Sequence, residues 1–416
     1  MSPRRPPAPN RQPNRPRIAL ALAGGGPLGA IHEVGALCAL EEALPGLDFT
    51  DLNAYIGVSA GAFIAAGLAN GMTPRQMCAA FIESDGGTDD LIDPSLFTRP
   101  AWREYRRRLR RLPSLAADAA WQVAAGKLPW VNALGLLGGA LPNGLFDNRA
   151  MQAQLERVFS APGRSNDFRQ LRRPLVVVAT DLDTGEAAPF GLPGWDTTPI
   201  SRAVIASAAL PGLYPPVAIH GRHYVDGALK KTIHASVLLD QGQDLLICLN
   251  PLVPFDASPR HAHHPAQAHD GKIPHLASVG LPAVLSQTFR SLIHSRLELG
   301  LKGYAHSHPE CDIVLIEPDR HDPQMFRAGT FSYTLRRELA EHAYQQTRRW
   351  LRNRCAELAQ VFGEHGVPLD LDSLFRERRL LPKLALRRSG NHLAERTHQV
   401  LDRLETELRR LAPETA

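Results

Sequence analysis

Apolar runs that end in glycine-rich turns are the main feature of the first seventy residues. Residues 17–23 (RIALALA) form one such run, which predicts a buried strand. The glycine loop 24–29 (GGGPLG) follows, and from residue 30 to 43 apolar side chains recur three and four positions apart, which predicts a helix. The hydrophobic pattern therefore predicts a unit of strand, glycine loop and helix.

A second unit of the same kind follows at once. The apolar run 52–56 ends in Gly57 to Gly61 (GVSAG), and an alanine-rich stretch with helical propensity comes next. Two successive units of this kind predict adjacent parallel strands with right-handed crossovers, so both turns lie at the carboxyl edge of one sheet. We therefore expect Ser59 to be a spatial neighbour of the glycine loop.

Strand-like and helical patterns continue to alternate along the chain. Apolar runs predict strands at 174–180, 223–225, 244–250 and 312–316, with a tight turn at 181–186. Amphipathic spacing predicts helices at 199–209, 283–304 and 333–362. This alternation predicts an α/β fold with a mainly parallel central sheet and a helical C-terminal region.

The chain is divided by changes of composition. We expect a disordered Pro/Arg-rich tail at 1–16, a principal domain at 17–250, the rest of that domain with its flanking helices at 251–375, and a charged helical extension at 376–416. Residues 84–148 read as a helical insertion. Its stretch 101–115 is basic, with apolar residues at helical spacing, which suits either a helix packed on the sheet or a cap that meets lipid headgroups.

Composition narrows the class of protein. With 416 residues, 44% hydrophobic and 21% charged, the chain can bury a substantial core. A net charge of +5 is modest for this length, and we expect no nucleic-acid partner. Five scattered cysteines argue against a disulfide scaffold and a zinc site, and suit a reducing compartment. We expect a cytoplasmic protein, peripheral to the membrane if 101–115 meets lipid.

A metal site is not expected either. The polar loop 254–274 and its neighbourhood contain five histidines, but no acidic or cysteine ligands lie at helical or hairpin spacing from them. We therefore expect neither a metal nor another cofactor.

The serine turn suggests nucleophilic chemistry. A serine between Gly57 and Gly61 at a strand-to-helix junction presents its hydroxyl where helix N–H groups and the helix dipole favour negative charge, although an ordinary glycine-rich turn has the same pattern. The amides of Gly24, Gly25 and Gly26 could bind an oxyanion, Gly25 and Gly26 foremost. Asp226 ends a strand in an Asp-Gly turn, either as a proton acceptor or as a type I′ turn residue.

These segments resemble the patatin-like phospholipase family, including its bacterial acyl hydrolases. The resemblance rests on the loop 24–29, on 57–61 and on Asp226-Gly227-Ala228, in that order, with further similar segments at 179–186 and 206–217. It covers about residues 17–251 well and the helical remainder loosely.

The resemblance implies a three-layer α/β/α fold that hydrolyses acyl esters of phospholipids and other lipids without a metal. It implies a dyad in which Ser59 attacks and Asp226 accepts the proton directly, with Gly29, Gly227 and Ala228 as further motif residues. One position departs from the family pattern: many members have Arg or Lys where this chain has Leu28. His32, one helical turn away, either supplies the missing charge or belongs to the core.

Three other interpretations remain open. The loop 24–29 also fits the dinucleotide-binding pattern G-x-G-x-x-G, with Asp48 or Asp51 about 20 residues on. An α/β-hydrolase triad would instead pair Ser59 with a late histidine such as His306 or His342. A protein of the same fold could also bind a membrane or a partner without turnover.

Overall fold

The structure is a computed structural model that describes residues 16–83, 94–127, 129, 132, 141–256, 276–322, 324 and 335–381. Everything reported below lies in the first of the two units into which the chain divides, Met1–Leu380. Several expectations fall outside the described residues: nearly all of the tail 1–16, parts of the insertion 84–148, the histidines of 257–275, and most of the extension 376–416.

One eight-stranded sheet forms the centre of this unit, in the order β5-β6-β3-β2-β1-β7-β8, with β4 also paired to β3. Its strands are β1 Ile18–Leu22, β2 Ala54–Val58, β3 Leu175–Asp181, β4 Ala187–Phe190, β5 Val217–Ile219, β6 Arg222–Asp226, β7 Leu245–Leu249 and β8 Asp312–Ile316. The strands from β3 through β8 in this order are parallel, and β4, β5 and β6 pair in antiparallel fashion. The expected α/β fold with a mainly parallel sheet is confirmed.

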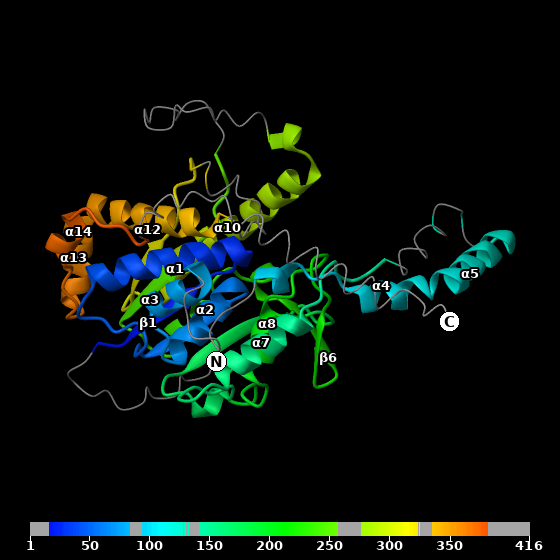
Figure 1. Ribbon diagram of the computed structural model, residues 1–416, viewed down its shortest axis with the longest axis horizontal. Coiled ribbons are helices and arrows are strands. Elements are labelled where there is room, and N and C mark those ends of the chain that lie inside the picture. The colour runs from blue at the N-terminus through cyan, green and yellow to red at the C-terminus, as the bar shows by residue number, and fades with distance from the viewer. Residues whose placement is uncertain are drawn as a thin grey trace, which may run out of the picture. The chain divides into compact units, whose positions relative to one another are not determined.

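Helices cover both faces of the sheet (Figure 1). They are α1 Gly26–Ala43, α2 Ala60–Ala69, α3 Pro74–Met77, α4 Trp102–Leu109, α5 Leu112–Ala124, α7 Arg149–Phe159, α8 Ile200–Ser207, α9 Ser236–Leu239, α10 Leu281–Ser307, α12 Arg336–Asn353, α13 Cys355–Glu364 and α14 Leu371–Phe375. On one face α2 packs on β1, β2 and β3, and α1 packs on α2 and α12. On the other face α9 and α10 bury side chains such as Leu238 and Ile293 against the sheet.

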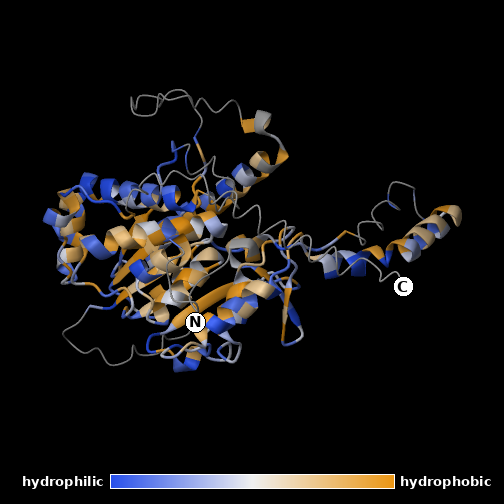
Figure 2. Ribbon diagram, in the orientation of Figure 1, coloured by the Kyte–Doolittle hydropathy of each residue, from blue (hydrophilic) through white to orange (hydrophobic). Residues whose placement is uncertain are grey.

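Full burial explains why the central strands read as continuous apolar runs. Every residue of β1, β2, β3 and β7 is buried, because helices cover both faces. Figure 2 shows hydrophobic strands in the central sheet and a mostly hydrophilic helix α12. None of the described helices has both the length and the hydropathy needed to cross a bilayer.

One expected helix is broken. Residues 333–362 were predicted to form a single helix, but α12 ends at Asn353, α13 begins at Cys355, and Arg354 between them leaves the helical region with φ −120° and ψ 18°. The prediction of a single helix was wrong. The sequence does not reveal the break, because Leu351 and Leu358 on either side of it are both buried and keep the helical spacing of apolar residues.

Candidate active site

Ser59 lies in the tight turn between β2 and α2. Its backbone has φ 53° and ψ −119°, a conformation that costs free energy for a residue with a side chain. A Cβ added at Gly57 would lie 2.4 Å from Cα of Ala62, and one added at Gly61 would lie 2.5 Å from the carbonyl oxygen of Ala23. The turn therefore requires glycine on both sides of the serine.

Ser207 at the end of α8 supports this strained turn. Its hydroxyl accepts the Ser59 N–H at 2.8 Å and donates to the Val178 carbonyl at 2.6 Å. Ser207 is fully buried. Sequence reasoning missed this residue, although it lies in the segment 206–217, which carries part of the family resemblance.

The register of β3 brings Asp226 next to Ser59. Val178 of β3 pairs with Val58, the last residue of β2, and the next residue, Ala179, pairs with Asp226 of β6. β4 pairs with Val177 to Thr180 of β3, so it occupies the edge of β3 that lies opposite β2. β6 therefore pairs with the same edge of β3 as β2, beyond the point where β2 ends. Ser59 follows Val58 directly, so the two functional candidates meet at this point.

Asp226 is buried and tied to the turn that follows it. The residue is 3% exposed, and Oδ1 accepts the Ala228 N–H at 2.9 Å. Burial raises the pKa of Asp226 to about 6, while the Ala228 amide and a hydrogen bond with the Ser59 side chain act in the opposite direction. The type I′ alternative was wrong, because Gly227–Leu229 form a 3₁₀ turn capped by Asp226.

The glycine loop lies directly beside Ser59 and the turn that follows Asp226. A Cβ added at Gly24 would be 3.1 Å from Cβ of Ser59 and 3.3 Å from Cβ of Ala228. Gly26 has φ 60° and begins α1, with Pro27 in the first turn. The first amides of a helix have no intrahelical acceptor, so this end of α1 favours negative charge.

A neighbouring loop holds the glycine loop in place. The ring of Pro251 would be 2.8 Å from a Cβ at Gly25, which would clash, and 3.1 Å from one at Gly29, which would be a tight contact. Gly227 is equally constrained, because its Cβ would lie 2.1 Å from the Val178 carbonyl oxygen. These motif glycines therefore permit the close packing of three separate segments around Ser59.

A cavity of about 750 Å³ opens onto Ser59, Asp226 and the amides of residues 24–26. Its walls are mostly apolar, and they include Phe63, Phe81, Leu155, Leu213, Leu285 and Phe289. Among the described residues that line it, Asp226 is the one carboxylate, Arg290 is the one cation, and none is a histidine. The cavity can hold an apolar molecule beside a serine hydroxyl, a buried carboxylate and the glycine loop.

The histidines considered for a triad lie elsewhere. His342 contacts Asp322, and Nδ1 of His306 lies 2.9 Å from the Lys302 carbonyl oxygen. The acidic residues of the dinucleotide interpretation precede β2, where Asp51 pairs with Arg173, and so lie at the edge opposite the glycine loop. These positions therefore favour neither a serine–histidine triad nor dinucleotide binding.

His32 does not supply the positive charge that is missing at Leu28. Leu28 is buried in α1. His32 is also buried, and burial lowers its pKa to about 4, with a further decrease from His342, so it is neutral at physiological pH. The core interpretation of His32 therefore holds.

Within the part of the chain that the structure describes, no group of three or more His, Cys, Asp or Glu side chains could hold a metal.

Two comparisons with known proteins found similar sequences or structures. A family model described as patatin-like phospholipase matches residues 20–239, just over half of the chain. VipD from Legionella pneumophila is a similar solved structure, with 15% identity, a TM-score of 0.35, and coverage of 82% of this chain and 67% of VipD. ExoU, solved in complex with SpcU from the type III secretion system of Pseudomonas aeruginosa, has 16% identity, a TM-score of 0.26, and coverage of 85% of this chain and 59% of ExoU.

The matched range contains all three motifs that carry the resemblance: the glycine loop, the serine turn with Ser59, and the segment that begins at Asp226. It also spans every strand from β2 to β6. The chain therefore belongs to the patatin-like phospholipase family.

Proposed function

We propose that this protein is a lipid acyl hydrolase that cleaves carboxylic esters through a dyad of Ser59 and Asp226. Family membership supports the general activity. The observation that carries the finer proposal is that a serine hydroxyl, a buried carboxylate and the glycine loop line one mostly apolar cavity. Ester hydrolysis by a serine needs these three components: a nucleophile, a proton acceptor and oxyanion donors.

Acylation follows from these positions. The Ser59 hydroxyl attacks the ester carbonyl carbon, and its proton passes to the Asp226 carboxylate. The carbonyl oxygen becomes an oxyanion, which the amides of Gly25 and Gly26 stabilise at the positive end of α1. When the tetrahedral intermediate breaks down, the C–O bond to the alcohol cleaves, Asp226 returns the proton to the departing alkoxide, and the acyl group stays on Ser59.

Deacylation uses the same groups. Asp226 removes a proton from a water molecule, which attacks the acyl-enzyme carbonyl and releases a fatty acid, and Ser59 recovers its proton. A carboxylate with an ordinary pKa is a weak base at neutral pH. Burial raises the pKa of Asp226 to about 6, which improves its strength as a base while leaving it mostly ionised at pH 7.

Two variants of the proposed dyad and one control variant test this proposal. Wild type, Ser59→Ala and Asp226→Asn are incubated with mixed phospholipids, and the released fatty acids and lysolipids are measured by mass spectrometry. We expect both variants to lose ~1,000-fold or more of the activity. His342→Gln is the matched control for a triad and should retain activity. Loss of activity in His342→Gln would refute the dyad.

A non-catalytic role is tested separately. A serine-directed fluorophosphonate probe should label wild type and should fail to label Ser59→Ala, because the probe reports an activated hydroxyl without requiring the right lipid. Absence of labelling in folded wild type, under conditions that label a related hydrolase, would favour a binding protein of the same fold.

We further propose that the segment 101–115 contacts the membrane surface. Trp102 in α4 is 68% exposed and Leu109 is 63% exposed, next to several exposed arginines. Figure 2 shows hydrophilic residues concentrated in α4 and mostly apolar ones in α5. Exposed aromatic and aliphatic groups beside basic residues favour an interface with anionic lipid.

Vesicle sedimentation tests this contact. A variant with glutamine at Arg103, Arg106, Arg110 and Arg111 should bind vesicles that contain phosphatidylglycerol about tenfold or more weakly than wild type. Added salt should weaken wild-type binding in the same way. Unchanged binding by the variant would refute the contact.

The cytoplasmic location stays a prediction that cell fractionation would test.

A further inference from the structure

His234 is a buried histidine just beyond the turn that follows Asp226. It lies between the 3₁₀ turn Gly227–Leu229 and α9, and it is 4% exposed. Its backbone has φ 52°, a conformation that costs free energy for a residue with a side chain and persists only where the surroundings hold it. Ile233 and Ala235 on either side of it are both buried in the core. The side chain of His234 therefore starts from a backbone that its neighbours fix in place.

The imidazole of His234 reaches back to the turn. Its Nε2 lies 3.3 Å from the Gly227 carbonyl oxygen, and since a carbonyl oxygen can only accept, Nε2 carries the proton and donates. Burial lowers the pKa of His234 to about 4 against the opposing effect of this hydrogen bond, and the charges of Lys231 and Lys230 add to the decrease. At neutral pH His234 is therefore an uncharged donor with one ring N–H.

The Gly227 carbonyl and the Ala228 N–H belong to one peptide group. A peptide group is planar and rigid, so a hydrogen bond at its oxygen restricts the direction of its N–H. That N–H is the one that Oδ1 of Asp226 accepts at 2.9 Å. Hydrogen bonds in such a series polarise one another, so donation by His234 also makes the Ala228 N–H a stronger donor. The contacts thus lead from His234 through one peptide group to the Asp226 carboxylate.

Other contacts hold the two ends of the turn. The Thr180 hydroxyl donates to the Asp226 carbonyl at 3.1 Å, which fixes the start of the turn. The Lys230 N–H donates to the Gly227 carbonyl at 3.2 Å, which closes the turn on itself. His234 adds a donor from outside the turn. Its hydrogen bond therefore ties the orientation of the peptide group to the rest of the domain.

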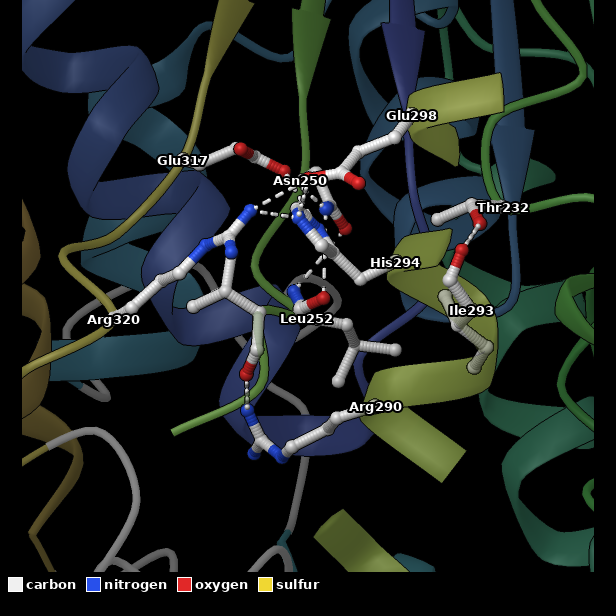
Figure 3. Close-up of polar contacts among 10 residues, drawn as sticks. Thr232, Asn250, Leu252, Arg290, Ile293, His294, Glu298, Glu317 and Arg320 are labelled. Carbon is white, nitrogen blue, oxygen red and sulfur yellow. Dashed lines mark hydrogen bonds and ion pairs between the residues drawn. The ribbon is translucent and has the colours of Figure 1, made fainter. Parts of the chain in front are cut away.

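The segment that carries His234 is also anchored to α10. Thr232 is buried, and its hydroxyl donates to the Ile293 carbonyl at 2.9 Å, as Figure 3 shows. Nη1 of Arg296 donates to the Leu229 carbonyl at 2.6 Å. The hydrogen bond of Thr232 goes to α10 and not to the peptide group beside Asp226. Thr232 is therefore a matched control for His234 within the same segment.

We propose that His234 is a positioning residue for Asp226, and that it holds the peptide group of Gly227 and Ala228 so that the Ala228 N–H stays directed at the carboxylate. This inference rests on the proposed role of Asp226 as the base. His234 is not among the residues that line the cavity with Ser59, so it acts through Asp226 and not on the substrate. Without its hydrogen bond the peptide group can turn, and Oδ1 loses the donor that fixes the carboxylate beside Ser59.

The pH profile of turnover gives a readout that is specific to this role. The Ala228 N–H lowers the pKa of Asp226, so its loss should raise the midpoint of kcat/KM above the value of about 6 expected for wild type. We expect His234→Ala to raise the midpoint by about half a pH unit or more and to lower kcat by about tenfold, with little change in KM. General loosening of the site would admit water and move the midpoint down, toward the ordinary value of an aspartate.

Two amide variants separate the hydrogen bond from stability. The side chain of His234→Gln can place an N–H where Nε2 lies, whereas that of His234→Asn is one methylene shorter and falls short of the Gly227 carbonyl. We expect His234→Gln to keep the wild-type midpoint and most of kcat. His234→Asn should behave like His234→Ala, although asparagine accepts a positive φ more readily than glutamine and should fold at least as well.

Thr232→Val is the control. It removes a buried hydrogen bond from the same segment, so it should unfold at a lower urea concentration while its pH midpoint stays at the wild-type value. An unchanged or lowered midpoint in folded His234→Ala would overturn the proposal. An equal upward shift in Thr232→Val would overturn it too, because the effect would then come from the segment as a whole.

A measurement without turnover separates this inference from the proposed function. The Asp226 carboxyl carbon is titrated by ¹³C NMR in wild type, His234→Ala and His234→Gln, with the signal assigned by its absence in Asp226→Asn. If wild type hydrolyses no ester, but His234→Ala raises the titration midpoint of Asp226 and His234→Gln restores it, the hydrolase proposal fails and the role of His234 stands. If fatty acids are released normally and Asp226 titrates alike in wild type and His234→Ala, the hydrolase stands and the role of His234 fails.

Discussion

Ser59 and Asp226 are brought together by consecutive residues of one strand. Val178 pairs with the residue that precedes Ser59, and Ala179 pairs with Asp226 itself. The two segments share one side of β3, where the parallel strand β2 ends and the antiparallel strand β6 takes over. A change of partner along a single strand thus creates the point at which Ser59 and Asp226 meet.

Removal of the Ser207 hydroxyl should impair the turn around Ser59. In Ser207→Ala the Ser59 N–H loses its acceptor at 2.8 Å, and the strained backbone loses a support. We expect kcat to fall ~10- to 100-fold and the free energy of unfolding to fall by about 1–3 kcal/mol. Enzyme kinetics and chemical denaturation measure the two effects.

Ser201→Ala is the matched control on the same helix. Ser201 is also buried, and its hydroxyl accepts a hydrogen bond from Asn166 at 3.0 Å, away from Ser59. It should lose comparable stability with kcat preserved. Equal losses of kcat in both variants would show that α8 acts on the site only through general stability.

A methyl group at Gly24 should displace Ser59. The added Cβ would lie 3.1 Å from Cβ of Ser59, closer than most real Cβ contacts, so Ser59 or the loop must shift. We expect kcat/KM to fall ~10- to 100-fold. Gly363→Ala, where an added Cβ meets nothing within 4 Å and α13 continues, should keep full activity and gain up to ~1 kcal/mol of stability. Full activity in Gly24→Ala would contradict the position of the glycine loop beside the reaction.

The raised pKa of Asp226 predicts the pH dependence of turnover. In the proposed mechanism the carboxylate is the active form, so kcat/KM should rise with pH, with a midpoint at about 6, and then level off. Below that midpoint the profile should fall tenfold per pH unit, because one proton blocks the base. Stopped assays on a substrate without ionisable groups measure this profile. A midpoint near the ordinary value of an aspartate would show that burial does not tune this group.

Glu33 should make stability depend on pH. It is fully buried in α1, both carboxylate oxygens have no hydrogen-bond partner among the described residues, and burial raises its pKa well above the ordinary value. Because the folded state favours the protonated form, its stabilising effect is present at acid pH and is lost as pH rises through the raised pKa.

Glu33→Gln cannot ionise and should therefore unfold with a free energy about 1–3 kcal/mol higher than wild type at pH 9, with a smaller difference at pH 5. Urea denaturation at the two pH values measures this difference. Glu338→Gln, at an exposed position of α12, is the control and should change stability little at either pH. A Glu33→Gln variant that is less stable than wild type at pH 9 would contradict the prediction.

Local patterns in the sequence were sufficient to predict much of this fold. Fully buried runs such as residues 18–22 and 175–181 are recognisable because strands covered on both faces contain little but apolar residues. The glycine turns at 24–29 and 57–61 could be placed at one edge because the handedness of parallel crossovers leaves one arrangement. The break at Arg354 escaped this reasoning, since apolar spacing continues through it.

The sequence by itself determined the elements, the two glycine-rich turns and the residue types that suit ester chemistry, because each depends on neighbours within one strand or one helical turn. Only the tertiary structure decided that Ala179 pairs with Asp226, that Ser207 holds the Ser59 amide, and that Arg290 faces the cavity. These relationships join segments far apart in the chain. They depend on register and side-chain packing, which no local spacing of apolar and polar residues encodes.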